Sequence, residues 1–139
     1  MYLLDTNVVS ELRRPKPHGG VVAWLSDLPD DQIRVSAVTL GELQAGVEIT
    51  REQDPEKAAA IEAWIDRVAE SHAVLPMDGS TFRLWARLMH HRSDDFIEDA
   101  MIAATAVIHD LVVVTRNVKD FVPFGVRTLN PFTAVRRRD

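Results

Sequence analysis

The stretch Tyr2-Leu3-Leu4-Asp5-Thr6-Asn7 decides the fold, because a short apolar run ends there abruptly in polar residues. Such a run predicts a buried strand whose carboxyl end delivers Asp5 to the edge of a sheet. In open parallel α/β sheets, ligands bind just outside that edge, so Asp5 is a candidate site residue. The alternative interpretation is that Asp5 only caps a helix beginning near Val8.

The composition is typical of one soluble globular domain. The chain has 139 residues, of which 46% are hydrophobic and 27% are charged, enough to bury a core without cross-links. It contains no cysteine, which excludes disulfides and thiolate metal sites. The formal net charge of −5 argues against binding nucleic acid by bulk positive charge, but it is compatible with acids that hold divalent cations.

No targeting or membrane-spanning segment is expected. The N-terminus lacks a basic segment followed by a long apolar run, and no apolar stretch approaches the roughly 20 residues needed to cross a bilayer. We therefore expect a cytoplasmic protein with a single domain over residues 1–139. Residues 135–139, with Arg136, Arg137 and Arg138, are expected to be a flexible basic tail.

Strands and helices alternate along the chain, which predicts an α/β fold. Residues 111–115 are continuous and β-branched, as in a central strand covered on both faces. Pro76 limits the strand at 73–77 to an edge or an end. The remaining expected strands are 2–4, 33–36 and 126–129, and the expected helices are 8–12, 21–28, 37–47, 55–68, 80–91 and 94–108.

Glu42 lies in the first turns of the helix that follows the strand at 33–36. A strand, a tight turn and a helix bring it to the carboxyl edge of the sheet, so it is the second candidate acid. The alternative is purely structural: Thr39 and Glu42 have the spacing of a helix capping box.

The third candidate is Asp99, in the acid cluster that opens the helix at 94–108. The helix dipole favours acids at this end, and we interpret Asp94, Asp95 and Glu98 as solvated caps. The dipole does not explain Asp99, which helical spacing places on the Ala-rich side of the helix, where a lone carboxylate is costly to desolvate.

Asp5, Glu42 and Asp99, together with Asp120 or Asn117 after the strand at 111–115, can converge on one edge of a parallel sheet. Like charges this close raise each other's pKa unless a cation shares the site. Mg²⁺ or Mn²⁺ suits oxygen ligands and leaves room for water and phosphate. The predicted chemistry is metal-assisted hydrolysis of a phosphodiester.

Polar neighbours of these acids are expected to support them. Thr115 and Asn117 are candidates for orienting water or a ligand carboxylate, and Arg116 or Lys119 for holding a substrate phosphate. Thr6 and Asn7, next to Asp5, belong to the same supporting group.

Four sequence blocks resemble those of PIN-domain proteins, in the same order. They are Leu4-Asp5-Thr6-Asn7, then Ser36 to Leu43 with Gly46, then Asp99 to Ala106, and then Thr115-Arg116-Asn117 with Asp120-Phe121. The chain is most similar to the VapC toxins of bacterial toxin–antitoxin pairs, including their FitB-like branch. The resemblance covers nearly the whole chain.

This resemblance implies a three-layer α/β/α fold with a mostly parallel sheet, and a Mg²⁺- or Mn²⁺-dependent endoribonuclease that acts as a toxin on RNA. It further implies a homodimer, neutralisation by a small cognate antitoxin, and promoter binding in which the antitoxin contacts the DNA. By position, Asp5 and Asp99 match the principal metal ligands and Glu42 the third acid. The fourth acid falls at Asn117 in some members and at Asp120 in others, which leaves a second metal open.

Two other functions remain open at this stage. The first is a catalytically silent PIN scaffold that acts only through antitoxin binding and promoter repression. The second is a PIN nuclease of RNA processing or decay. Crowded acids at positions 5, 42 and 99 argue against the scaffold, and the short chain argues against the processing enzyme.

Overall fold

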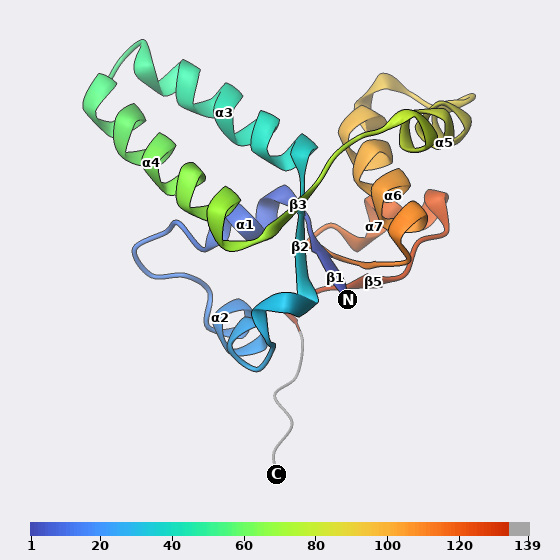
Figure 1. Cartoon of the computed structure of the whole chain (residues 1–139), viewed down its shortest axis with the longest axis horizontal. Helices are drawn as coiled ribbons and strands as arrows, with labels where there is room; N and C mark the ends of the chain where they lie inside the picture. Colours follow the sequence, from blue (N-terminus) through green and yellow to red (C-terminus); the bar gives the residue numbers. More distant parts are fainter. Residues whose placement is uncertain (134–139) are drawn as a thin grey trace.

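The computed structural model describes residues 1–133, so the basic tail expected at 135–139, with Arg136, Arg137 and Arg138, lies outside the described residues. Within them, the strands form a parallel sheet in the order β3-β2-β1-β4-β5 (Figure 1). The strands are β1 (Tyr2–Leu4), β2 (Ile33–Ser36), β3 (Ala73–Leu75), β4 (Val112–Val114) and β5 (Thr128–Leu129).

Helices cover both faces of this sheet, which confirms the three-layer α/β/α prediction. In Figure 1, α1 to α4 lie on one side of the sheet and α5 to α7 on the other. Their bounds are α1 (Thr6–Glu11), α2 (Gly19–Ser26), α3 (Ala37–Arg51), α4 (Pro55–Ser71), α5 (Gly79–Met89), α6 (Ile97–His109) and α7 (Val118–Phe121). Three short 3₁₀ turns, η1 (Asp30–Gln32), η2 (Asp94–Phe96) and η3 (Val122–Phe124), complete the described part.

Adjacent residues of one strand enter different cores, because successive side chains of a strand point to opposite faces. Leu3 packs with Val113 and the Ala-rich face of α6. Leu4 packs with Val114 and with the apolar residues of α1 and α2. The two central strands are therefore buried on both sides, as their uninterrupted apolar sequences predict.

The structure corrects several predicted boundaries. As predicted, residues 111–115 contain an inner strand, β4, which lies between β1 and β5, while β1 occupies the middle of the sheet. The helix expected at 94–108 begins at Ile97, because Asp94–Phe96 forms a 3₁₀ turn capped by Ser93. The final strand is shorter than expected and contains only Thr128–Leu129. The strand at Ala73–Leu75 is an edge strand, as Pro76 indicates.

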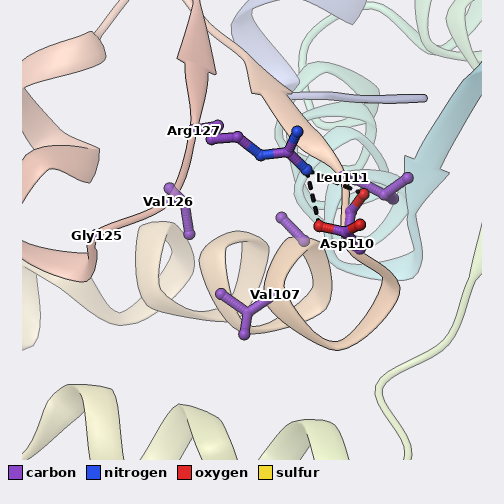
Figure 2. A pocket seen from close by; sticks show the side chains of 7 residues that line it. Val107, Asp110, Leu111, Gly125, Val126 and Arg127 are labelled. Atoms are coloured by element: carbon purple, nitrogen blue, oxygen red, sulfur yellow. Dashed lines mark hydrogen bonds and ion pairs between the residues drawn. The ribbon is translucent and has the colours of Figure 1, made fainter.

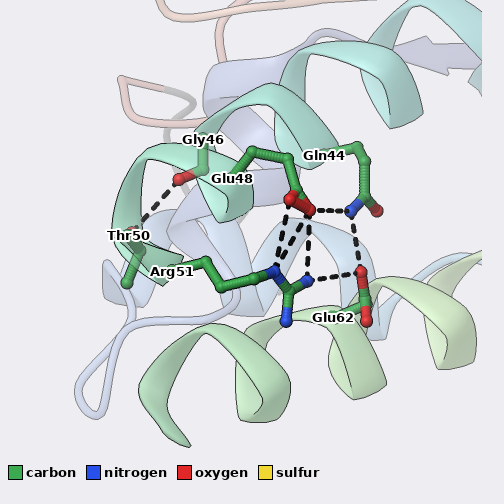
Figure 3. Close-up of polar contacts among 6 residues, drawn as sticks. All are labelled: Gln44, Gly46, Glu48, Thr50, Arg51 and Glu62. Carbon is green, nitrogen blue, oxygen red and sulfur yellow. Dashed lines mark hydrogen bonds and ion pairs between the residues drawn. The ribbon is translucent and has the colours of Figure 1, made fainter. Parts of the chain in front are cut away.

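The helices α3 and α4 form a hairpin that projects from the sheet (Figure 1). An apolar seam that includes Val47 and Ile65 holds the two helices together. Toward the tip, Arg51 donates to Glu62 at 2.9 Å and pairs with Glu48 on its own helix (Figure 3). Among the described residues, no helix has both the length and the apolarity to cross a bilayer.

Candidate active site

The carboxyl ends of the parallel strands place the predicted residues at one edge of the sheet. Leu4 is in register with Val35 on one side and with Val114 on the other. The next residues along the three strands are Asp5, Ser36 and Thr115, and each is buried. The register alone therefore brings Asp5 beside Thr115, although the two residues are far apart in the sequence.

Asp5 is fixed by three donors. Its Oδ1 accepts from the Thr6 backbone N–H at 2.8 Å, and its Oδ2 accepts from Thr115 Oγ1 at 2.9 Å and from Asn7 Nδ2 at 3.2 Å. Asp5 is only 7% exposed, and this burial raises its pKa, with a further contribution from the charge of Asp120. Asp5 also caps α1, so the helix-cap interpretation and the site interpretation are both compatible with its contacts.

Glu42 lies inside α3 and faces the same edge. Its Oε1 accepts from Thr6 Oγ1 at 2.9 Å, and burial raises its pKa, as do the charges of Asp5 and Glu98. The capping-box alternative is wrong, because α3 is capped by Ser36, whose Oγ accepts from the Val38 N–H. Ser36 has the extended backbone that a helix cap requires, whereas Thr39 is already helical.

Asp99 is half-buried in the first turn of α6. Among the described hydrogen bonds, none involves its carboxylate. Burial raises its pKa to about 7, and the charges of Asp5, Asp120, Glu42 and Glu98 add to this effect. The charges of three predicted acids thus reach Asp99 from β1, α3 and α7. Asp94, Asp95 and Glu98 are exposed, as predicted, but their interpretation as caps is wrong, because Ser93 caps the η2 turn and no side chain caps α6.

Asp120 and Asn117 were alternatives for the fourth position. Asp120 is half-buried in α7, and its charge raises the pKa of both Asp5 and Asp99. Asn117 is exposed, and its backbone N–H donates to Thr115 Oγ1 at 3.0 Å. Electrostatics therefore couples Asp120, rather than Asn117, to the other acids.

The supporting residues form one connected network. Asn7 donates to Asp5 and accepts from the Arg116 backbone N–H at 3.2 Å, so it joins β1 to the loop after β4. Thr39 also belongs to this network, since its hydroxyl lies 3.0 Å from Thr6 Oγ1, and this role was not predicted. Its position one helical turn before Glu42, on the same face, is the signal that could have revealed it.

The donor set fits a hard divalent cation that keeps much of its water. Within residues 1–133, no three Asp, Glu or His side chains are placed to hold a metal ion among themselves. Mg²⁺ typically needs only one or two carboxylates, and all candidate ligands here are carboxylate oxygens. The mutual rise of pKa at Asp5, Glu42 and Asp99 is the electrostatic cost that a cation would relieve.

A small cavity of about 170 Å³ lies away from these acids, at the other end of α6. Figure 2 shows the ion pair between Arg127 and Asp110, two of its lining residues, whose N–O distance is 2.8 Å. Its other lining residues are mostly apolar and include Val107 and Leu111. This cavity therefore contains none of the candidate catalytic residues.

The sequence matches the PIN domain over residues 2–122, and the chain belongs to the PIN-domain family. It is 35% identical to Toxin FitB of Neisseria gonorrhoeae, over 95% of this chain and 99% of that protein. It is 34% identical to the VapC ribonuclease Y4jK of Sinorhizobium fredii, over 95% and 98% of the two chains.

Solved structures of related proteins are also similar to this chain. The structure of FitAcB from Neisseria gonorrhoeae contains a chain with a TM-score of 0.84 and 32% identity, covering 96% of this chain and all of that one. FitAB bound to an IR36 DNA fragment matches with a TM-score of 0.84 and 30% identity, over 99% and 100%. VapBC-5 of Mycobacterium tuberculosis, described as a member of a family of toxin–antitoxin systems, matches with a TM-score of 0.61 and 30% identity, over 88% and 89%.

Proposed function

We propose that this protein is the toxin of a type II toxin–antitoxin pair and acts as a metal-dependent endoribonuclease in the cytoplasm. The proposal depends on the position of Asp5, Glu42, Asp99 and Asp120 at one edge of the sheet, where Thr6 contacts both Asp5 and Glu42, and where burial and the other charges raise the pKa of Asp99 to about 7. Carboxylates this close to one another repel and destabilise the folded protein unless a cation shares the site. The similarity to a toxin and to a ribonuclease over nearly the whole chain supports the same function.

In this function, Asp5, Asp99 and Glu42 would hold Mg²⁺, or Mn²⁺ in its place, with one or two of these carboxylates as direct ligands and the remainder acting through bound water. When bound, the ion lowers the pKa of a water and stabilises charge on the phosphodiester. Thr6, Asn7 and Thr115 orient Asp5, and Thr6 also orients Glu42.

Asp120 supplies the fourth carboxylate of the catalytic site. Arg116 and Lys119 are both exposed near it and provide positive charge for substrate phosphate. Asn117, in the loop between them, helps to fix Thr115 through its backbone N–H.

We further propose that the protein forms a homodimer and is neutralised by a small antitoxin, which contacts promoter DNA for the complex. The similarity to FitAB bound to DNA and to VapBC-5 supports this assembly. The net charge of −5 also favours a partner as the source of the DNA contacts, because DNA binding needs cations to neutralise phosphates.

The test is cleavage of a structured RNA pool by the purified chain with Mg²⁺, with Mn²⁺ and with a chelator. We expect cleavage with the metals, none with the chelator, and none by Asp99→Asn. Asp94→Asn is the matched control, because Asp94 is an exposed acid just before the same helix. If the wild type cleaves RNA no more than the background seen with Asp99→Asn, with either metal, the nuclease is rejected and the silent scaffold is favoured.

A second experiment separates a toxin from an RNA-processing nuclease. Induced expression of the chain in bacteria should arrest growth, and co-expression of the small protein encoded by a neighbouring gene should restore it. Normal growth during expression of an enzyme that is active in vitro would favour RNA processing instead.

A further inference from the structure

Arg116 follows Thr115, the residue whose hydroxyl donates to Asp5, and its backbone is held on both sides. Its N–H donates to Asn7 Oδ1 at 3.2 Å, and its carbonyl accepts from Asn130 Nδ2 at 3.3 Å. Asn7 in turn donates to Asp5 Oδ2 at 3.2 Å. Two consecutive hydrogen bonds therefore connect the backbone of Arg116 to the Asp5 carboxylate.

The side chain of Arg116 lies over an aromatic ring. Its guanidinium carbon is 4.6 Å from the centre of the Phe132 ring, a cation–π distance. Asn130 supports both partners, because its Oδ1 accepts from the Phe132 N–H at 2.9 Å while its amide donates to Arg116. The pair is thus held together by side-chain stacking and by a shared asparagine.

Phe132 is itself firmly seated. Its ring packs against the core cluster that contains Leu4 and Val114, and the ring of His18 lies 5.1 Å away at 55°. The turn around Pro131 approaches the chain so closely that a Cβ at Gly20 would lie 2.9 Å from the Pro131 carbonyl oxygen. Gly20 is therefore needed for the turn to reach the start of α2.

The positive charge of Arg116 is not used in an ion pair with any residue of 1–133. The four ion pairs found there involve Arg14, Arg51 twice, and Arg127. Arg116 is also exposed. A planar guanidinium that rests on an aromatic ring presents its other face to solvent, and unpaired RNA bases stack on such planes.

We propose that Arg116 and Phe132 form a stacking seat for an unpaired base of the RNA strand, next to the phosphate held at the catalytic acids. The proposal rests on the function proposed above and adds the feature of the substrate that this site recognises. A base in duplex RNA is already stacked and paired, so the seat selects single-stranded RNA.

Binding can be measured without cleavage in the Asp99→Asn protein. The probe is a short fluorescein-labelled oligouridylate, read by anisotropy, with a second copy that carries one 2-aminopurine whose fluorescence is quenched by stacking. Arg116→Lys keeps the charge but loses the plane, and Phe132→Leu removes the ring. We expect each to weaken binding about fivefold or more, the effect of one lost stacked base, and to relieve the quenching.

Two further variants keep the result interpretable. Phe132→Trp retains an aromatic ring and should preserve both affinity and quenching. Arg67→Ala removes an exposed cation on α4 and should change neither. Thermal unfolding of each variant reports whether it is folded. If Phe132→Leu does not fold, Arg116→Lys still tests the proposal, because Arg116 is exposed and its replacement should not disturb the fold.

Unchanged affinity and quenching in Arg116→Lys would overturn the seat and reduce Arg116 to a simple charge. Duplex RNA that binds as tightly as the oligouridylate, or no binding of either, would also overturn it. If the wild type cleaves RNA while these results are negative, only the seat fails. If the seat variants lose affinity and quenching but the wild type never cleaves RNA, the seat stands as a binding site and the nuclease fails.

Discussion

Thr6 Oγ1 donates a hydrogen bond to Glu42 Oε1 at 2.9 Å and so joins the first residue of α1 to the helix after β2. The backbone N–H of Thr6 also donates to Asp5 Oδ1 at 2.8 Å. One residue therefore positions two carboxylates of the candidate site. The fully buried hydroxyl of Thr39, 3.0 Å away, helps to orient that of Thr6.

Replacing Thr6 by Val should weaken metal binding while keeping the fold. The variant keeps the backbone N–H that caps α1 through Asp5, but Glu42 loses the hydrogen bond that lowers its pKa, so that pKa rises further. Mn²⁺ affinity measured by calorimetry should fall roughly 10- to 100-fold, the usual effect of losing a residue that supports a ligand. The rate of RNA cleavage should fall with it.

The matched control for this substitution is Thr50→Val, on the same helix as Glu42. The Thr50 hydroxyl donates to the Gly46 carbonyl at 3.1 Å, at the hairpin shown in Figure 3. The Mn²⁺ affinity of the Thr50→Val variant should equal that of the wild type. If Thr6→Val also binds Mn²⁺ as the wild type does, Glu42 does not hold the metal.

Without divalent cations, the protein should become less stable as the pH rises from about 5 to about 8. The pKa of Asp99 is raised from 3.8 to about 7 in the folded state. Between these two pH values, Asp99 is therefore protonated in the folded protein but ionised in the unfolded chain. Unfolding free energy therefore falls as pH increases toward 7 and stays low above it. Screening of the half-exposed carboxylate limits the loss to about 1–2 kcal/mol. Urea unfolding at the two pH values measures it.

Asp99→Asn should remove most of this pH dependence and be more stable than the wild type at about pH 8. Asp66→Asn, at an exposed carboxylate on α4, should retain the wild-type slope. Mn²⁺ added at the higher pH should restore stability to the wild type, because it binds only the folded state. A wild-type stability that is flat over this range would show that Asp99 is not crowded by the other acids.

The residues that lie at the carboxyl edge of the sheet were easier to predict from the sequence than the side-chain contacts they make there. Asp5 and Asp99 could be placed because a strand end and a helix start fix where a residue lies, whatever its side chain touches. The central position of β1 could not be predicted, because residues 2–4 and 111–115 are both continuous apolar runs. Both strands pair on two sides, and only the strand order places β1, rather than β4, in the middle of the sheet.

The contacts among supporting residues depend on tertiary packing. Thr39 with Glu42 fits a capping box locally, but the cap belongs to Ser36, where β2 ends. The stacking of Arg116 on Phe132 joins the ends of two neighbouring strands and has no local signal in the sequence. Such contacts follow from strand order, which short-range patterns do not specify.

Glu42 and Glu98 provide a paired test of which glutamate belongs to the site. Glu42→Gln should reduce RNA cleavage by at least about 10- to 100-fold, because it removes a carboxylate oriented by Thr6. Glu98→Gln should remain within about twofold of the wild type, because Glu98 is exposed and its charge acts on the site only from a distance. A larger loss in Glu98→Gln than in Glu42→Gln would reverse the assignment. Both variants keep the size of the side chain, so folding should be unaffected.

Asp120→Asn and Asn117→Ala decide which position supplies the fourth group. Removing the charge of Asp120 lowers the pKa of Asp99 and Asp5, since that charge raises both. The acidic limb of the profile of kcat/KM against pH should therefore move to lower pH, and the rate at its plateau should fall if Asp120 also acts in catalysis. Asn117→Ala should leave the limb in place, because Asn117 carries no charge and its backbone bond to Thr115 is retained. A limb that does not move in Asp120→Asn, with a rate lost in Asn117→Ala, would assign the fourth position to Asn117.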